Sequence, residues 1–174
     1  MLKLKKICDV SKDNAAKAKS LYYRAFPKNE RRPFPELTEY RIGDTETFCI
    51  FDDNLFVGMA VVMNSPSIAH IIYLAIEDSL RGHGYGSQAL KLLHEFYSEK
   101  KTMVDIERCD GTSKNEEQRV LRKQFYLKSG YSETSVKYRW RNENYEILSF
   151  GGNITEQDYN EFWTDFFNNS TKSS

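Results

Sequence analysis

The stretch that most constrains this chain is Arg81–Gly86, where three glycines lie between a run of apolar residues and a segment with helical periodicity. The apolar run covers Ile71–Ile76, and the helical pattern extends over Tyr85–Lys100. A strand, a glycine turn and a helix in this order bring unpaired backbone N–H groups to the positive end of a helix dipole. Glycine accepts positive φ angles and lets a ligand approach the backbone closely. The stretch therefore predicts a cradle for a phosphate-bearing ligand.

The spacing of these glycines excludes the two commonest phosphate-binding motifs. The dinucleotide fingerprint requires G-x-G-x-x-G with an acidic ribose partner about 20 residues later, whereas this chain has G-x-G-x-G. A P-loop requires a lysine before Ser or Thr at the start of the helix, but here Ser87 directly follows Gly86. The sequence also offers no residue to read a base or a ribose, which disfavours a nucleotide-binding protein.

Arg81, Gly84 and Gly86 match the pattern Gln/Arg-x-x-Gly-x-Gly/Ala. This pattern resembles the acetyl-CoA-binding motif of the GCN5-related N-acetyltransferases, the GNAT family. The resemblance extends to the preceding strand, Tyr73–Glu77, to the following helix, and to Phe125–Tyr131, which is similar to the family's Tyr-x-x-x-Gly-Phe signature. The structural alternative is a glycine turn that only tightens a connection between strand and helix.

The resemblance implies an α/β (α+β) fold with a mixed, mostly antiparallel central sheet, a splayed pair of parallel strands and flanking helices. In this fold the pantetheine arm of CoA enters the gap between the parallel strands and pairs with the backbone of the first. The residues expected to bind acetyl-CoA, the co-substrate, are Leu74, Ala75, Ile76, Arg81, Gly82, His83, Gly84, Tyr85, Gly86 and Ser87. No metal site is expected, because the three histidines lack the spacing of zinc ligands.

Acetyl transfer to an amine requires two proton movements. The departing CoA thiolate needs a proton, and the resemblance implies that Tyr126 donates it as the general acid. An amine with a pKa of about 10.4 is protonated at pH 7, and deprotonating it costs about 4.6 kcal/mol. We predict Glu107 as the base because it ends the second parallel strand, with Glu30 as the second candidate. A core tyrosine with a satisfied hydroxyl is the alternative for Tyr126.

The loop Pro27–Pro35 contains three prolines and joins the first two predicted helices. In the resembled fold this segment arches over the acceptor side of the site, so Glu30 and Arg31 are candidates for substrate binding, together with Arg32. Solvated loop charges are the alternative interpretation.

The helix before Tyr126 departs from the family pattern. Many members carry Asn seven residues before the tyrosine and a small residue three later, whereas this chain has Arg119 and Arg122. These arginines either contact CoA phosphates or the acceptor, or they are solvated helix charges.

Hydrophobic patterning predicts the remaining elements. The expected strands are the alternating N-terminal stretch from Leu2, then Thr47–Phe51, Leu55–Met63, Ala69–Ile76, Met103–Glu107, Ser132–Trp140 and Asn144–Phe150. Five helices are expected. The first starts at Ser11 or Asp13 and stops at Phe26, the second covers about Pro35–Ile42, and the third starts at Tyr85. The fourth runs from a capping box at Ser113 and Glu116 to Ser129, and the fifth starts at a cap formed by Thr155 and Asp158. The last helix carries an aromatic stripe, Tyr159, Phe162, Trp163 and Phe166, that packs on its own core or, alternatively, on a dimer partner.

The 174 residues are expected to form one acetyltransferase domain over 1–167, followed by a polar disordered tail over 168–174. Because 25 basic residues balance 25 acidic ones, we expect no nucleic-acid and no membrane partner. The N-terminus does not resemble a signal peptide. Cys8, Cys49 and Cys109 are odd in number and far apart, which favours buried, reduced thiols in a cytoplasmic protein. The expected state is a monomer or a homodimer.

These features predict an acetyl-CoA-dependent N-acetyltransferase that transfers an acetyl group directly from CoA to a primary amine of a small molecule or a protein. No covalent intermediate is expected, because no cysteine lies within the matched motifs. The alternative is a non-catalytic acyl-CoA-binding regulatory module that keeps the cradle and lacks turnover. The presence of Tyr126 favours the enzyme.

Overall fold

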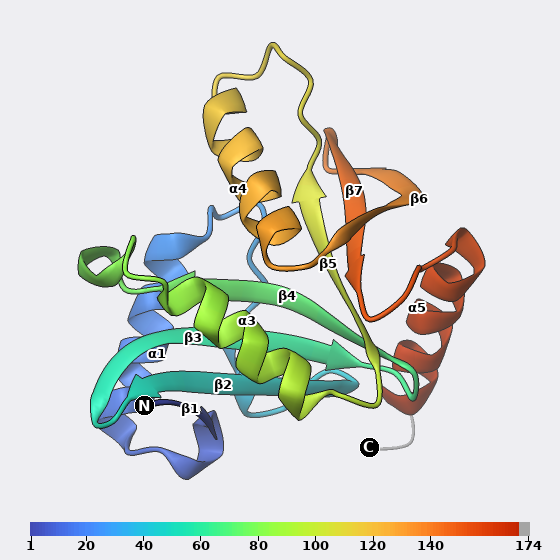
Figure 1. The fold of residues 1–174 in the computed structure, drawn as a ribbon. Helices are drawn as coiled ribbons and strands as arrows, with labels where there is room; N and C mark the ends of the chain where they lie inside the picture. The colour runs from blue at the N-terminus through green and yellow to red at the C-terminus, as the bar shows by residue number, and fades with distance from the viewer. Residues whose placement is uncertain (171–174) are drawn as a thin grey trace.

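The computed structural model describes residues 1–170, which form a seven-stranded sheet with helices on both faces (Figure 1). The strands are β1 (Leu2–Lys6), β2 (Asp44–Asp52), β3 (Leu55–Asn64), β4 (Ile68–Ile76), β5 (Lys101–Glu107), β6 (Ser132–Trp140) and β7 (Glu143–Phe150). The helices are α1 (Lys12–Ala25), α2 (Phe34–Thr38), α3 (Tyr85–Phe96), α4 (Glu116–Lys128) and α5 (Glu156–Ser170), with short 3-10 turns η1 (Ile7–Asp9) and η2 (Asp78–Leu80). The strand order is β1-β2-β3-β4-β5-β7-β6, and only β4 and β5 are parallel. The predicted fold class is confirmed.

The parallel strands β4 and β5 are paired over three positions only, from Ile68 with Lys101 to His70 with Met103. They start side by side and then diverge (Figure 1). The pairing of β3 with β4 shifts at this point, which leaves Ile72 as an extra residue in β4. A bulge of this kind bends its strand and increases the twist. Beyond the bulge β5 continues along β7, and a gap opens between β4 and β5.

The helix starts and turns follow from local sequence. Ser11 caps α1 by accepting the N–H of Asn14 at 3.3 Å, and the helix ends at Phe26, directly before Pro27. The hairpin between β2 and β3 turns through Asp53, which has a φ of 51°. Both features match the sequence predictions, because each depends on neighbours within a few residues.

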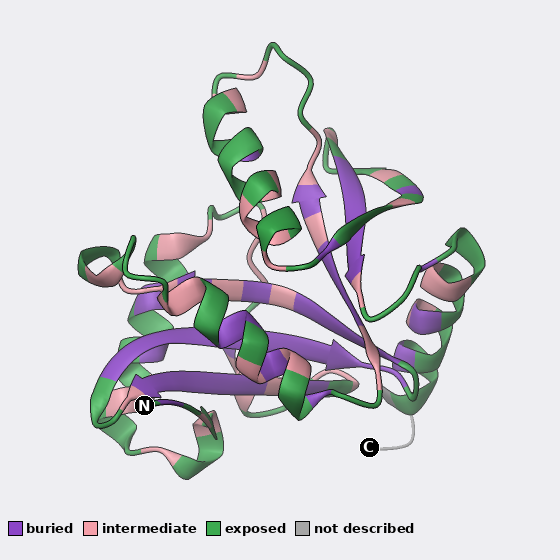
Figure 2. Ribbon diagram, viewed as in Figure 1, coloured by how far each residue is buried: buried purple, intermediate pink, exposed green. Residues whose placement is uncertain are grey.

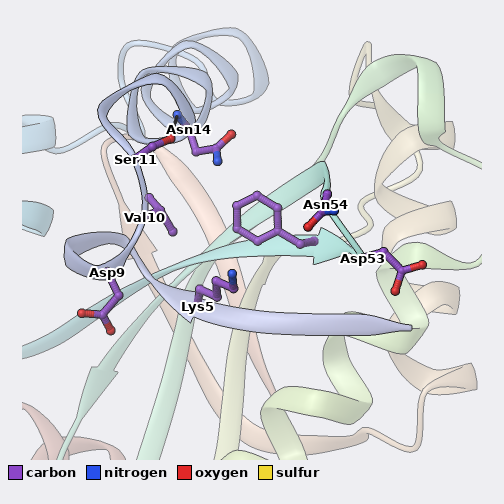
Figure 3. A pocket seen from close by; sticks show the side chains of 8 residues that line it. Lys5, Asp9, Val10, Ser11, Asn14, Asp53 and Asn54 are labelled. Carbon is purple, nitrogen blue, oxygen red and sulfur yellow. Dashed lines mark hydrogen bonds between the residues drawn. The ribbon is translucent and has the colours of Figure 1, made fainter.

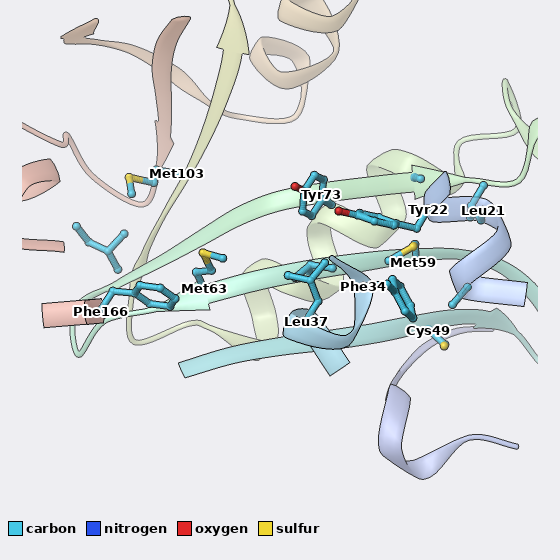
Figure 4. Packing of buried hydrophobic residues seen from close by; sticks show 14 of the residues in the cluster. Leu21, Tyr22, Phe34, Leu37, Cys49, Met59, Met63, Tyr73, Met103 and Phe166 are labelled. Atoms are coloured by element: carbon cyan, nitrogen blue, oxygen red, sulfur yellow. The ribbon is translucent and has the colours of Figure 1, made fainter. Parts of the chain in front are cut away.

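The sheet separates two apolar layers. On one face α1, α2 and α5 cover a cluster that includes Tyr22, Leu37, Met59, Met63 and Phe166 (Figure 4). On the other face α3 packs on β1 to β5 through Ala89, Leu90 and Leu93. Every residue of β3 after Leu55 is buried, so this central strand is covered from both sides (Figure 2).

Helix α5 packs on the core of its own chain, as its aromatic stripe predicts. Thr155 and Asp158 form the predicted capping box, in which each side chain accepts the backbone N–H of the other, at 2.9 and 3.1 Å. Phe162 and Phe166 are buried in the core. The helix continues to Ser170, so residues 168–170 of the predicted tail are helical, while residues 171–174 lie outside the described residues.

The capping box predicted for α4 is absent. The Ser113 hydroxyl donates to Asp110 at 2.7 Å, and Asp110 also accepts the N–H groups of Thr112 and Ser113 at 2.9 Å each. Glu116 accepts the N–H of Asp110 rather than that of Ser113. Asp110 thus organises a local turn that competes with helix capping, and α4 begins at Glu116.

Two further expectations need correction. Cys49 is buried, but Cys8 and Cys109 are exposed, so the prediction of three buried thiols is wrong for two of them. Helix α3 ends at Phe96 rather than near Lys100, because β5 begins at Lys101. Within residues 1–170 no helix has the length and apolar character needed to span a bilayer.

Candidate active site

The glycine stretch lies between β4 and α3, with η2 at its start. Gly82 and Gly84 have φ angles of 79° and 80°, which L-residues with a side chain rarely adopt. Gly84 is the N-cap of α3, and no side chain in the described part of the chain caps this helix. The first N–H groups of α3 are therefore available to an anion at the positive end of the helix dipole.

The third glycine has a different role. A Cβ atom at Gly86 would lie 3.2 Å from the ring of Phe125 on α4, tighter than ordinary contact. A Cβ atom at Gly82 would meet nothing within 4 Å. Gly86 thus lets α3 approach α4 closely, whereas the space above Gly82 is open. Ser87, on the first turn of α3, is exposed.

Three side chains of the predicted cradle are engaged within the protein. Arg81 is 58% exposed and pairs with Asp78 at 2.8 Å. His83 donates from Nδ1 to the Arg81 carbonyl at 2.9 Å. The Tyr85 hydroxyl donates to Asp52, at the end of β2, at 2.9 Å. The cradle therefore offers chiefly backbone N–H groups, with the Arg81 guanidinium as an exposed positive charge nearby.

The second half of β4 leads into this cradle. Leu74, Ala75 and Ile76 pair with β3 on one side only. Their other backbone edge faces the gap toward β5 and has no strand partner in residues 1–170. An extended ligand can pair with such an edge as an added strand does.

Tyr126 lies on α4 against the rings of Phe125 and Tyr131, with ring centroids at 5.1 and 5.3 Å. Its hydroxyl forms no hydrogen bond with any group in residues 1–170. Burial raises the pKa of Tyr126 to about 12, with Arg122 lowering it and Asp105 raising it further. The hydroxyl is therefore protonated at neutral pH and free to donate.

Glu107 ends β5 and is held by an ion pair with Arg119 at 2.6 Å. The arginine side chain is only 4% exposed, and it also pairs with Glu143 at 3.1 Å and donates to the Arg108 carbonyl at 3.0 Å. Arg122 is half-exposed, 3.9 Å from Glu107. Arg119 is thus neither a solvated charge nor free for a phosphate, because carboxylates from β5 and β7 already occupy it.

Glu30 reaches the same place from the loop between α1 and α2. The Tyr73 hydroxyl of β4 donates to the Glu30 carbonyl at 2.7 Å, and the Tyr22 hydroxyl bonds both backbone groups of Arg32 at 2.9 Å. The carboxyl groups of Glu30 and Glu107 interact with each other. Burial and the neighbouring charge of Glu107 raise the pKa of Glu30 to about 7.

A third carboxylate, Asp105, belongs to a buried network that the sequence analysis did not identify. Asp105 accepts from His70 Nε2 at 3.1 Å and from the Tyr138 hydroxyl. Burial favours the protonated form of Asp105, but His70 and Tyr138 outweigh it and lower its pKa. His70 is 1% exposed beneath Phe162 and Trp163 of α5, and its Nδ1 has no partner in the described chain.

Glu30 and Glu107 interact with each other, and Glu30 and Tyr126 both interact electrostatically with Asp105 and Arg122. Arg31 does not join them. Its guanidinium stacks on Tyr23 at 4.8 Å and donates to the Tyr23 carbonyl. Among residues 1–170 no group of His, Cys, Asp or Glu side chains is arranged to hold a metal ion.

A cavity of about 260 Å³ lies elsewhere, beside the start of α1 (Figure 3). It is lined by Lys5, Asp9, Val10, Ser11, Asn14, Phe51, Asp53 and Asn54. None of the predicted site residues lines it. Its mixed polar lining is distinct from the cradle and from the carboxylates around Glu107.

Comparisons with known proteins bear on the family and the fold. The model of the acetyltransferase (GNAT) family matches residues 15–131. A GNAT-family protein from Bacteroides thetaiotaomicron shares 25% identity, with 92% of each chain covered and a TM-score of 0.74. A search of curated proteins gave no match.

Two more distant structures share the fold. The ribosomal-protein-S18-alanine N-acetyltransferase of Escherichia coli has 12% identity and a TM-score of 0.62, covering 91% of this chain and 98% of its own. Arabidopsis thaliana Naa50, in complex with a bisubstrate analogue of CoA and a peptide, has 16% identity and a TM-score of 0.60, covering 87% and 99%. With the family model matched over most of the chain, this protein belongs to the GNAT acetyltransferase family.

Proposed function

We propose that this protein is an acetyl-CoA-dependent N-acetyltransferase that transfers the acetyl group directly to a primary amine. One observation carries the proposal: the edge of β4 at Leu74–Ile76, which has no strand partner in residues 1–170, is followed through η2 by the N-terminus of α3 at Gly84, which no described side chain caps. The two features suit the two ends of CoA, because its pantetheine arm carries amides and its pyrophosphate carries negative charge. The remaining cradle residues, Arg81–Ser87, border the same path.

Bound acetyl-CoA supplies a thioester whose carbonyl carbon is open to attack by an amine. Tyr126 is the proposed proton donor to the leaving sulfur. A hydroxyl with no competing partner among the described groups and a pKa of about 12 keeps its proton at neutral pH until a strong base appears beside it. Glu107 and Glu30 are the proposed acceptors for the proton of the attacking amine.

The acceptor is proposed to be a small-molecule amine or a protein amine. Acceptor entry is proposed from the side of the loop Pro27–Pro35, where Glu30 lies. The proposal includes a cytoplasmic location, no nucleic-acid or membrane partner, and a monomer or homodimer. Arg31 is a weaker candidate for acceptor contact, because Tyr23 already holds its guanidinium.

Calorimetric titration with acetyl-CoA, followed by a free-thiol assay across a panel of amines, tests this function. The panel should contain a diamine, an amino acid, an aminoglycoside and a short peptide with a free N-terminus. Micromolar binding with amine-dependent thiol release is the expected result. Binding without release from any amine would favour the acyl-CoA-binding module, and absence of binding would remove the cradle assignment.

A further inference from the structure

The two carboxyl groups at the candidate site differ in how the protein holds them. Glu107 is fixed by Arg119 at 2.6 Å, with Asn115 donating to the same oxygen at 3.4 Å. One oxygen of the Glu107 carboxylate is therefore already occupied by two donors from within the protein. Its side chain is 11% exposed, so little water competes for it.

The Glu30 carboxyl group forms no ion pair with any group in residues 1–170, although Arg122 acts on it electrostatically. Its loop is fixed through the backbone, by Tyr73 at the Glu30 carbonyl and by Arg141, in the turn between β6 and β7, at the Asn29 carbonyl. The carboxyl group itself is left facing Glu107. Two carboxyl groups in contact do not both ionise easily, and the one without a cation is the one that takes up a proton.

The charged neighbours of Glu30 come from two elements, β5 and α4. Strand β5 contributes Glu107 and Asp105, and helix α4 contributes Arg122. On β7, Tyr145 lies within the field of the same carboxylates, and burial together with Glu30 and Glu107 raises the pKa of that phenol. Arg119 and Arg122 both lie beside Glu107, so the ionised carboxylate of Glu30 itself supplies the negative charge that attracts an ammonium group.

We propose that Glu30 is the catalytic base that accepts the proton of the acceptor ammonium, and that Glu107, fixed by Arg119, is a positioning residue. This inference rests on the proposed function and assigns the base within it. It reverses the order in which sequence reasoning ranked the two carboxylates.

Glu30, as carboxylate, takes one proton from R–NH3⁺ and leaves the neutral amine, whose nitrogen lone pair forms the new N–C bond with the thioester carbonyl. The C–S bond breaks, and its electron pair leaves on sulfur, which receives a proton from Tyr126. The nitrogen loses its second proton to the resulting tyrosinate, and Glu30 releases its proton to solvent. The products are the N-acetyl amine, CoA thiol and one proton.

The pH dependence of kcat/KM tests this assignment, because this parameter reports the free enzyme. With the fastest amine of the panel, the wild type should lose activity below about pH 7 as Glu30 takes up a proton. Glu30→Gln should lower kcat/KM by roughly 10²-fold to 10⁴-fold and abolish this acid limb. Glu107→Gln should retain more activity and move the limb to lower pH, because a neighbouring negative charge is removed. Glu39→Gln, on the exposed end of the adjacent helix, is the matched control and should behave as the wild type.

Carbon-13 NMR of the Glu30 carboxyl group gives a readout that needs no acceptor. Its titration midpoint should lie near neutral pH, fall in Glu107→Gln and rise in Arg122→Gln. The assignment would be overturned if Glu30→Gln kept the acid limb and Glu107→Gln lost it. A titration midpoint of Glu30 at an ordinary carboxyl value would overturn it as well. Either result would leave the proposed acetyltransferase activity intact. A protein that binds acetyl-CoA but releases thiol with no amine would overturn the proposed function and the base together.

Discussion

The guanidinium group of Arg119 lies 2.6 Å from the carboxylate of Glu107, and both side chains are largely withdrawn from water. The pair joins the first turn of α4 to the last residue of β5. It therefore fixes the helix that carries Tyr126 relative to the strand that carries the acidic residues of the site.

Replacing Arg119 by methionine should lower the free energy of unfolding by about 3–5 kcal/mol, because removing one partner leaves the buried charge of Glu107 uncompensated. Arg122→Met is the control, since Arg122 is half-exposed and 3.9 Å from the same carboxylate. It should cost at most about 1 kcal/mol. Urea unfolding measures the loss of unfolding free energy in each variant. Equal losses would show that the Arg119–Glu107 pair stabilises the fold no more than the half-exposed Arg122 does.

The cradle predicts a large effect of charge at Gly84. Gly84→Glu should weaken acetyl-CoA binding by about 100-fold or more, because like charges in contact cost several kcal/mol. Gly151→Glu is a matched control, since both glycines have a φ of 80° and therefore incur similar backbone strain. Calorimetric titration of both variants with acetyl-CoA separates the effect of charge at the cradle from the effect of backbone strain. Unchanged affinity in Gly84→Glu would contradict the assignment of this stretch as the CoA cradle.

Tyr126 and Tyr131 offer a second matched pair. Tyr126→Phe should slow turnover by roughly 10²-fold to 10⁴-fold with little change in stability, because its hydroxyl has no partner among residues 1–170. The Tyr131 hydroxyl contacts His94 at 2.9 Å and Thr102 at 3.2 Å. Tyr131→Phe should cost about 1 kcal/mol of stability and leave turnover unchanged. Thiol release and thermal unfolding distinguish the two roles, and normal turnover in Tyr126→Phe would assign that hydroxyl elsewhere.

The raised pKa of Glu30 also predicts a pH effect on stability. Between the ordinary value of 4.5 and about 7 the folded protein holds a proton that the unfolded chain has released. Raising the pH through this window therefore lowers the free energy of unfolding. Burial lowers the pKa of His94 to about 4, so below pH 6.5 the unfolded chain holds a proton on this histidine that the folded protein lacks, and stability rises with pH there. The effect of Glu30 is therefore measured as the difference between the wild type and a Glu30 variant.

Urea unfolding at pH 5 and pH 8 gives this difference. Glu30→Gln should gain stability relative to the wild type as the pH rises from 5 to 8, because the variant has no carboxyl group to ionise. Parallel changes in the two proteins would mean that Glu30 titrates normally.

The elements that depend on short-range chemistry could be read from the sequence. Ser11 and Thr155 cap their helices as predicted, and Gly84 adopts the left-handed conformation that its motif requires. The capping box predicted at Ser113 failed for an equally local reason, because the Ser113 hydroxyl donates to Asp110, three residues earlier. Local rules therefore succeed where one partner is available and fail where two compete.

The arrangement of the acidic residues depends on contacts far apart in sequence. Nothing local to Arg119 indicates burial, since the carboxylates that pair with it, Glu107 and Glu143, come from β5 and β7. The loop that carries Glu30 is held by Tyr73 and Arg141, which are both far from it in sequence. The sequence did contain a weak indication that Asp105 is functional. Asp105 shares one face of β5 with the buried Met103, and at such a position an apolar residue is expected.

The short pairing of β4 with β5 has a mechanical consequence. The sheet consists of two plates, β1–β4 and β5–β7–β6, that share three residue pairs at one corner. Helix α5 spans this corner, since Phe162 packs on His70 of β4 at 5.5 Å and Tyr159 stacks on Tyr138 of β6 at 5.7 Å. Helix α5 thus joins the two parts of the sheet by side-chain packing at the corner where few backbone pairs connect them, and loss of its aromatic stripe would leave the three residue pairs of β4 and β5 to hold that corner.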